Sequence, residues 1–337
     1  MKRRDFLRTG ALSTAVLSGL SVSFGDDAEV KEEPQQKVIF AGRKGKPYPG
    51  WGDGPVEHVT AYNPDFADKT LWIRKDNMVL AAYRNNPNQI YPYIYPLAGP
   101  RSMVSVTTES AQPWPHHRSV FLGLDHVNGG NYWQADRKSG QILSQGVKVL
   151  EATPTKVSFR DTAIWKKEGQ DPIINDSRVY TFDLRSNDYY VLDIKYQMTP
   201  IVDITVTKTN HGFFGVRVSP ELAPDGGGFL VNSNGQSGQK ETEGKIAKWC
   251  VLYGKRFFNP SIIEGVAVFC PPKKPFENCP WFTRSYGNVS PMPFNYAPGP
   301  WKFPAGQPLE AFYRLVVFAG LPEDVDLNGL WNEAYEN

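Results

Sequence analysis

The 337-residue chain carries 37 lysines and arginines against 35 aspartates and glutamates, a formal net charge of +2. Residues 1–25 contain four basic side chains and one acidic side chain, so the remainder has a net charge of about −1 and no basic block, which excludes an electrostatic groove for nucleic acid. No segment beyond residue 25 is long and apolar enough for a transmembrane helix, so we expect no integral membrane association of the mature chain.

The first residues have the pattern of an export signal. Arg3 and Arg4 are followed by a polar residue and Phe6-Leu7, and a moderately apolar stretch then runs to Ser23-Phe24-Gly25, where small residues suit cleavage after Gly25. An amphipathic helix or a membrane anchor is the alternative, but the stretch is short and rich in Ser, Thr and Gly. Residues 1–25 are therefore predicted to be a twin-arginine signal peptide, with the twin-arginine translocase as partner and a periplasmic or otherwise extracytoplasmic destination.

The rest of the chain is predicted to be one large domain. Residues 26–37 are charged and lack aromatic side chains, which indicates a flexible leader. No Pro-, Ser- or Gly-rich linker divides residues 38–337, so a single domain is preferred over two.

Alternation of apolar and polar residues recurs along this domain, while helical periodicity is scarce. The strand candidates are 70–75, 78–83, 104–108, 147–153, 179–184, 190–196, 203–207, 215–218, 228–232, 249–253, 265–269 and 310–318, and the one expected helix covers 325–334. Strands that follow one another without intervening helices favour an all-β fold, a large antiparallel β-sandwich with few short helices.

The three cysteines allow two interpretations. Cys270 and Cys279 flank a Pro-rich loop and could form a disulfide across it in an exported protein. Alternatively, all three, including Cys250, are small buried hydrophobic residues. An odd number of cysteines without a CxxC motif argues against a zinc cluster.

Histidine, arginine and amide side chains gather in a few segments. His116, His117 and Arg118 precede His126 and Asn128 within thirteen residues. Adjacent histidines on an extended backbone point to opposite faces, so His116 and His117 are not expected to share one task. Histidine is suited to proton transfer near neutral pH, although loop histidines can also simply bond to the backbone.

Further polar clusters lie downstream. His211 precedes a strand that carries Arg217, Asn232 follows an apolar strand, and Arg284 and Tyr286 stand in an aromatic segment. Amides, arginines and aromatic rings together are typical of carbohydrate sites, because sugars offer apolar faces and hydroxyl groups, although most aromatic residues must fill the core. The spacing of the histidines is not diagnostic of a metal site, and neither a metal nor a cofactor is predicted.

At these clusters the chain resembles the bacterial family DUF6807, whose members often carry the label "methane oxygenase PmoA". The segments that carry the resemblance lie within residues 70–318: 93–100, Pro115-His116-His117-Arg118 with 125–133, 213–220, 232–235 and 281–294. The glutamate that the family has in its Lys-Glu-Gly-Gly segment is replaced by Thr209 or Asn210. The methane label implies a membrane-embedded copper oxygenase, which the lack of transmembrane segments rejects. The resemblance also suggests, by analogy of layout, a galactose-mutarotase-like supersandwich.

We therefore expect an exported carbohydrate-related protein whose partner is a small carbohydrate or glycan fragment. The first hypothesis is a lyase, epimerase or hydrolase in which His116, His117 or His211 acts as acid or base. The ligand would be bound by a second set of residues, namely Arg118, His126, Asn128, Arg217, Asn232, Arg284 and Tyr286. The alternative is a non-catalytic glycan-binding module with the same cleft.

Export through the twin-arginine route depends on the arginine pair. Changing Arg3 and Arg4 together to lysine should leave unprocessed precursor in the cytoplasm, as measured by fractionation and immunoblotting. Normal export of this variant, combined with arrest when the general secretory route is blocked, would show that the signal belongs to the other pathway.

Overall fold

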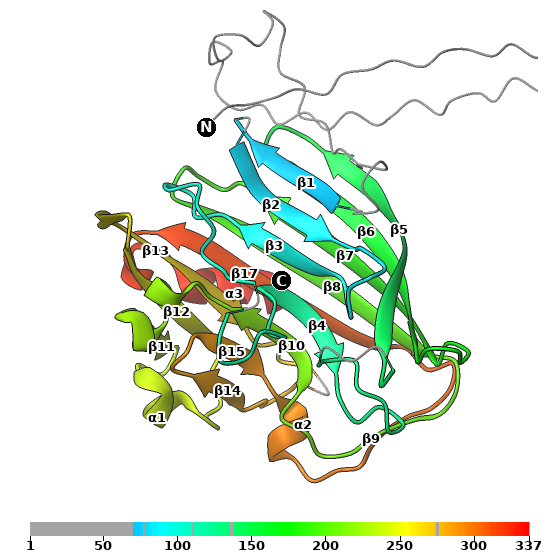
Figure 1. Cartoon of the computed structure of the whole chain (residues 1–337). Helices are drawn as coiled ribbons and strands as arrows, with labels where there is room; N and C mark the ends of the chain where they lie inside the picture. Colours follow the sequence, from blue (N-terminus) through cyan, green and yellow to red (C-terminus); the bar gives the residue numbers. More distant parts are fainter. Residues whose placement is uncertain (1–69, 77, 110, 135–137, 274–275, 337) are drawn as a thin grey trace, which may run out of the picture. The chain divides into compact units, whose positions relative to one another are not determined.

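The alternation that predicts strands in the sequence is also the alternation of burial in the structure. The structure is a computed structural model that describes residues 70–336 apart from 77, 110, 135–137 and 274–275. In strand β8 (Tyr189–Pro200), for example, Ile194, Tyr196 and Met198 are buried while Lys195 and Gln197 are exposed. The all-β prediction is confirmed, because two large antiparallel sheets and only a few short helices make up the described chain (Figure 1).

The first sheet has seven strands and carries the site discussed below. Its order is β1-β2-β3-β4-β10-β15-β14, and every adjacent pair is antiparallel. The strands are β1 (Thr70–Lys75), β2 (Met78–Arg84), β3 (Tyr93–Leu97), β4 (Val120–Leu124), β10 (Gly212–Arg217), β15 (Asn288–Pro291) and β14 (Trp281–Arg284).

The second sheet has eight strands in the order β11-β12-β13-β17-β8-β7-β6-β5. They are β11 (Phe229–Asn232), β12 (Trp249–Arg256), β13 (Asn259–Phe269), β17 (Leu309–Ala319), β8, β7 (Ile174–Asp183), β6 (Lys156–Lys166) and β5 (Gln141–Ala152). A small sheet pairs β9 (Ile204–Val206) with β16 (Trp301–Phe303). The α-helices are α1 (Gly238–Thr242), α2 (Pro293–Tyr296) and α3 (Leu327–Tyr335).

The two large sheets pack face to face, and each also has an outer face. Phe214 of β10 stacks on Tyr313 of β17 with ring centroids 4.3 Å apart, which identifies the inner face of each sheet. Helix α3 covers the outer face of the eight-stranded sheet, where Trp331 packs against Phe318 and its neighbours in a second apolar cluster. Because side chains alternate, Gly215 and Arg217 lie on the outer face of the seven-stranded sheet.

Glycine at position 215 is required by the aromatic rings that cover this outer face. A Cβ atom added to Gly215 would lie 2.8 Å from the ring of Phe121 and 3.2 Å from that of Trp133. These two rings are 4.6 Å apart between centroids. The sheet therefore carries an aromatic layer on its outer face, and the site is built on that layer.

Several strands differ from the expectation. Residues 104–108 form no strand, because only the isolated bridges of Ser105 and Thr107 pair there and Met103 has a left-handed φ of 54°. Six strands were not predicted: β3, β4, β6, β14, β15 and β16. All five residues of β4 are buried, so it lacks the alternation that marks a half-buried strand.

The chain divides into two units, Met1–Gln35 and Gln36–Asn337, and the described residues belong to the second. The predicted signal peptide (1–25) and leader (26–37) lie outside the described residues, so their boundaries stay predictions. Within the described part, no helix has both the length and the apolar character needed to cross a membrane. Cys250, Cys270 and Cys279 are all buried free thiols, as the second interpretation of the cysteines expects.

A buried ionic network lies between the two sheets. Asp176 accepts hydrogen bonds from Arg178 at 2.7 Å and from Trp165 at 2.6 Å, and the side chains of Asp176 and Arg178 are fully buried. Asp161 accepts a hydrogen bond of 2.6 Å from Tyr83, which belongs to the opposite sheet, and burial raises the pKa of Asp161 to about 6. The network thus links the two sheets through satisfied polar groups.

Removing one partner of this network should be far more costly than removing both. Asp176→Asn leaves the charge of Arg178 uncompensated and should lower the free energy of unfolding by ~3–5 kcal/mol in urea titrations followed by circular dichroism. The double variant Asp176→Leu with Arg178→Met should lower the free energy of unfolding by less than the single variant does. Arg101→Gln, which breaks the exposed pair with Asp188, should cost less than about 1 kcal/mol. Equal losses in the single and double variants would contradict this account.

Candidate functional site

The double histidine lies in a turn that leads into β4. The backbone N–H of His117 donates to the carbonyl oxygen of Trp114 at 3.0 Å, so this segment is not extended. The expectation that His116 and His117 face opposite sides was therefore wrong. Their rings lie at 4.6 Å between centroids and nearly at right angles, and both contribute to the same cavity.

His211 approaches this pair from the start of β10. Its ring centroid is 6.1 Å from that of His116, and its ring stacks on Trp133 at 6.2 Å. The Nδ1–H group donates to Oδ2 of Asp125 at 3.3 Å, and the backbone N–H of Asp125 donates to the carbonyl oxygen of His211. The carboxylate thus orients the imidazole and leaves Nε2 as the proton acceptor.

The carboxylate of Asp125 is held in its charged form. Burial alone would raise the pKa of Asp125, but the hydrogen bonds from His211 and from the backbone N–H of His126 outweigh it, so the pKa lies below its usual value. The charged carboxylate stabilises a proton that reaches His211, which is the arrangement expected of a general base with an orienting partner.

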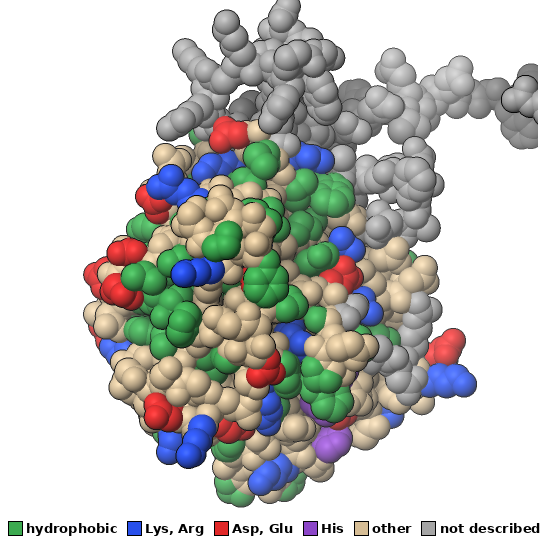
Figure 2. All heavy atoms as spheres, turned by 60° about the vertical axis from the view of Figure 1, so that its left-hand side comes forward, with side chains coloured by type: hydrophobic (Ala, Val, Ile, Leu, Met, Phe, Trp, Pro, Cys, Tyr) green, Lys and Arg blue, Asp and Glu red, His purple; other side chains and the backbone are tan. Residues whose placement is uncertain are grey.

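These side chains surround a cavity of about 360 Å³. The lining combines three imidazoles with aromatic rings and amides: Trp114, His116, His117, Gln134, Asn210, His211, Phe282, Arg284 and Tyr286. A space-filling view shows the visible histidine side chains side by side on one face of the molecule (Figure 2). A cavity of this size accommodates a small ligand such as one or two sugar rings.

His116 and His117 are uncharged at neutral pH. Burial, followed by the positive field of His211 and Arg217, lowers the pKa of His116 to about 4. Burial, followed by the field of His116 and Arg217, lowers the pKa of His117 to about 2. His116 Nε2 and His117 Nδ1 are buried without a hydrogen-bond partner, so both rings can serve a ligand as neutral donors or acceptors.

Arg284 and Tyr286 line the cavity on the side of β14 and β15, and Arg217 packs against Tyr286 without lining the cavity. The guanidinium of Arg217 lies 4.4 Å from the ring centroid of Tyr286, which in turn stacks on His117 at 6.1 Å. Arg284 lines the cavity but forms an ion pair with Glu243 at 2.7 Å. Burial raises the pKa of Tyr286 to about 12, so its hydroxyl stays protonated.

Five of the predicted residues line the cavity, namely His116, His117, His211, Arg284 and Tyr286, and Arg217 lies next to it against Tyr286. Arg118 stacks on Tyr93 and is 3.7 Å from Glu109, and it does not line the cavity.

The remaining three predicted residues have local partners. His126 is exposed and contacts the carbonyl oxygen of Lys208, and Asn128 bonds to the backbone of the 203–205 segment. Asn232 closes its own turn and lines a different hollow.

Sequence reasoning missed several members of the site. Asp125 orients His211, and only its place directly after β4, opposite the residue that precedes β10, would have pointed to it. Phe282 of β14 and three residues outside the strands also line the cavity, and no local pattern indicates that they meet: Trp114, Gln134 and Asn210.

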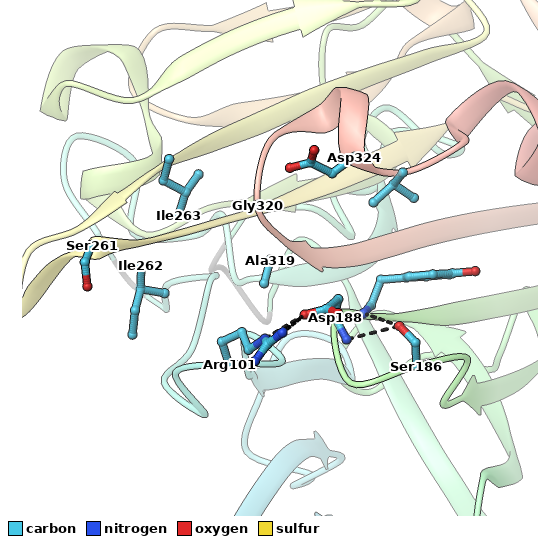
Figure 3. A pocket seen from close by; sticks show the side chains of 11 residues that line it. Arg101, Ser186, Asp188, Ser261, Ile262, Ile263, Ala319, Gly320 and Asp324 are labelled. Carbon is cyan, nitrogen blue, oxygen red and sulfur yellow. Dashed lines mark hydrogen bonds and ion pairs between the residues drawn. The ribbon is translucent and has the colours of Figure 1, made fainter.

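A larger hollow of about 790 Å³ lies elsewhere, between residues 186–189, 261–263 and 319–325 (Figure 3). Its charged groups already have partners, since Arg101 is paired with Asp188 and the carboxylate of Asp324 accepts a hydrogen bond from the backbone N–H of Leu321. None of the residues described around it has a buried polar atom without a partner, whereas the histidine cavity has two, His116 Nε2 and His117 Nδ1. We therefore take the smaller cavity as the candidate site.

No group of three His, Cys, Asp or Glu side chains in the described part of the chain is arranged to hold a metal ion.

The model of a family of unknown function, DUF6807, matches residues 70–332. No curated protein matches the chain at a significant level. Among solved structures, the chain is similar to a protein described as a kojibiose phosphorylase from the human microbiome, with 10% identity and a TM-score of 0.30 over 76% of this chain and 31% of that one. It is also similar to the GalM/aldose epimerase homologue from C. elegans, with 10% identity and a TM-score of 0.29 over 75% and 99%. The chain thus spans about a third of the first of these structures.

The buried neutral state of His117 should make stability depend on pH. Its pKa is lower in the folded chain than the ordinary 6.5, so the unfolded chain binds more protons between these values and stability falls as the pH falls below about 6.5. Between pH 6.5 and 5, this loss amounts to roughly 2 kcal/mol for one histidine. Urea titrations over this pH range should show that His117→Gln loses less free energy of unfolding than the wild type, and the difference should equal this amount.

The same pair of proteins at pH 8 supplies the control for this measurement. Both forms of residue 117 are neutral there, so any difference between them reports packing alone. A pH dependence that is identical in the two proteins would mean that His117 is not buried as described.

Proposed function

Since the chain belongs to DUF6807, a family whose description assigns no activity, we propose a function from the site itself: an enzyme that acts on a sugar or keto-sugar fragment by histidine-based proton transfer. The observation that carries this proposal is the His211–Asp125 pair, which faces two neutral imidazoles across a cavity of about 360 Å³. An oriented base beside neutral polar groups is what proton abstraction from a bound ligand needs.

The lining supports a sugar as the ligand. Trp114, Phe282 and Tyr286 offer apolar faces on which the C–H groups of a pyranose can stack. Gln134 and Asn210 offer donors and acceptors for hydroxyl groups at the same cavity. The combination is less suited to an extended apolar ligand, because the two amides and three imidazoles would then lose their partners.

The carboxylates near the cavity help to decide between hydrolysis and the lyase or epimerase reactions. Glycoside hydrolysis usually uses two carboxylates on either side of the scissile bond. None of the described lining residues carries a carboxylate. The two carboxylates nearby are already bound, because Asp125 accepts a hydrogen bond from His211 and Glu243 forms an ion pair with Arg284. We therefore favour a lyase or an epimerase, which transfers a proton at a ring carbon, over a hydrolase.

A non-catalytic glycan-binding module is the second candidate, and one observation favours it. The pKa values of His116 and His117, about 4 and about 2, make these rings poor proton carriers at neutral pH and good hydrogen-bond partners for hydroxyls. In this alternative the cavity binds a sugar and leaves it unchanged.

Export to an extracytoplasmic compartment is part of the proposal. It rests on the arginine pair and the apolar stretch that follows it within residues 1–25. A periplasmic location would place the cavity among glycan fragments that enter from outside the cell.

The two candidates differ in how they respond to loss of the base. In the enzyme, His211→Ala should lower kcat by ~10²–10⁴ with little change in binding, because proton transfer is lost while the cavity walls remain. Asp125→Asn should lower kcat as well, since the imidazole loses its orientation. Turnover is measured by chromatography of a panel of oligosaccharides and keto-sugars, and binding by calorimetry.

Arg101→Gln is the matched control, because it removes a charge from the separate hollow without touching the cavity. In a binding module, the wild type would transform none of the panel, and His211→Ala would weaken binding by only about 1 kcal/mol. Binding of a sugar without any turnover would therefore replace the enzyme with the binding module.

A further inference from the structure

In the described part of the chain, buried arginines have carboxylate partners, with one exception. Arg178 is paired with Asp176 at 2.7 Å, Arg314 with Asp193 at 2.7 Å, and Arg256 with Glu221 at 3.3 Å. Such pairs offset the cost of removing the guanidinium from water. They show how this fold usually accommodates a buried positive charge.

Arg217 is the exception among the described residues. It is only 2% exposed and forms no ion pair, and its one hydrogen bond runs from Nη2 to the carbonyl oxygen of Gln112 at 2.7 Å. Its Nε and Nη1 atoms are buried without a partner. Burial lowers the pKa of Arg217, and the opposing fields of Tyr286 and Asp225 do not outweigh this effect. A buried guanidinium without an ion-pair partner is costly for the free protein.

The strand register places this arginine in a polar row that leads to the cavity. Arg217 of β10 is opposite Asn288 of β15, and Asn288 is opposite Arg284 of β14, which lines the cavity. Opposite residues in antiparallel strands project to the same face. Asn288 is fully buried, and both its Oδ1 and its Nδ2 lack partners.

The histidines and Tyr286 connect the row to the ligand space. Arg217 contributes to the electrostatic field at both His116 and His117, so its charge lies close to the cavity. Tyr286 lines the cavity and also packs on the guanidinium, so it is a wall shared by the two. A rotation of the Tyr286 side chain would open the guanidinium to a ligand.

From this arrangement we propose that Arg217 and Asn288 bind a carboxylate of the ligand, so that the sugar is an acidic one, a uronate. The sugar part of this statement rests on the proposed function. Hydroxyl groups could accept hydrogen bonds from the free N–H groups, but they carry no negative charge to pair with the guanidinium. A carboxylate supplies both the acceptor oxygens and the negative charge. One guanidinium and one amide form a small donor set that matches the two oxygens of a carboxylate better than the three oxygens of a sulfate or phosphate ester.

The test compares matched ligands on the wild-type protein. The methyl glycosides of glucuronate, galacturonate and mannuronate are titrated by calorimetry, each beside its methyl ester and the neutral hexoside. At least one uronide should bind about tenfold or more tightly than its ester, because hydrogen bonds to a charged group are worth roughly 1.5–3 kcal/mol. Equal affinity for acid and ester, binding of no uronide, or a preference for sulfated or phosphorylated sugars would overturn the proposal.

Variants then show which residue is responsible. Arg217→Gln should abolish the preference for acid over ester and leave the affinity for the neutral hexoside within about twofold. Since the substitution removes an uncompensated buried charge, the variant should be at least as thermostable as the wild type, which a merely structural arginine would not allow. Arg101→Gln, with the same loss of charge far from this row, should keep the preference.

The outcome is separable from that of the proposed enzyme. If the protein prefers a uronide but turns over no ligand, the proposed enzyme is rejected and the carboxylate site is supported. If the protein turns over a neutral sugar and shows no preference for the acid, the proposed enzyme is supported and the carboxylate site is rejected. If Arg217→Gln does not fold, the comparison of acid with ester on the wild type still decides the question.

Discussion

The pairing of β4 with β10, and of β10 with β15, is the constraint on which the site depends. These three neighbouring strands bring together residues that are 86 positions (Asp125 and His211) and 71 positions (Arg217 and Asn288) apart in the chain. The register of β4 and β10 sets Asp125 beside His211, and that of β10 and β15 sets Arg217 beside Asn288. A shift by one residue would turn every one of these side chains to the opposite face, so the pattern of buried residues in the sheet also fixes the chemistry of the site.

Much of the fold could be predicted from the sequence, because half-buried strands leave a periodicity of two. Strand β1 was predicted with its observed ends and β8 to within a few residues. The fully buried β4 and the proline-containing β3 lack that signal. At the site, the predicted histidines converge because the 112–118 segment turns. The prediction that His116 and His117 point to opposite faces failed for the same reason, since it assumed an extended backbone. Asp125 could not be assigned a role without knowledge of the strand register.

Two sets of buried charged and imidazole side chains differ in how well their polar atoms are matched. Between the sheets, Asp176, Arg178 and Asp161 have their partners, and the result is a stable and well-defined interface. At the outer face, His117 and Arg217 lack theirs although they are equally deep. Natural proteins tolerate such mismatches mainly where a ligand completes them. The contrast within one molecule is therefore more informative than the burial of any single residue.

The position of Tyr286 has a consequence for how a ligand enters the site. His211 lines the cavity directly, whereas the guanidinium of Arg217 packs against the ring of Tyr286 and does not line the cavity. A ligand can therefore contact the histidine without any movement of the protein, but it contacts the arginine only after Tyr286 turns aside. Binding at the arginine thus follows binding at the histidine, and the freedom of one aromatic ring sets the rate of the second step.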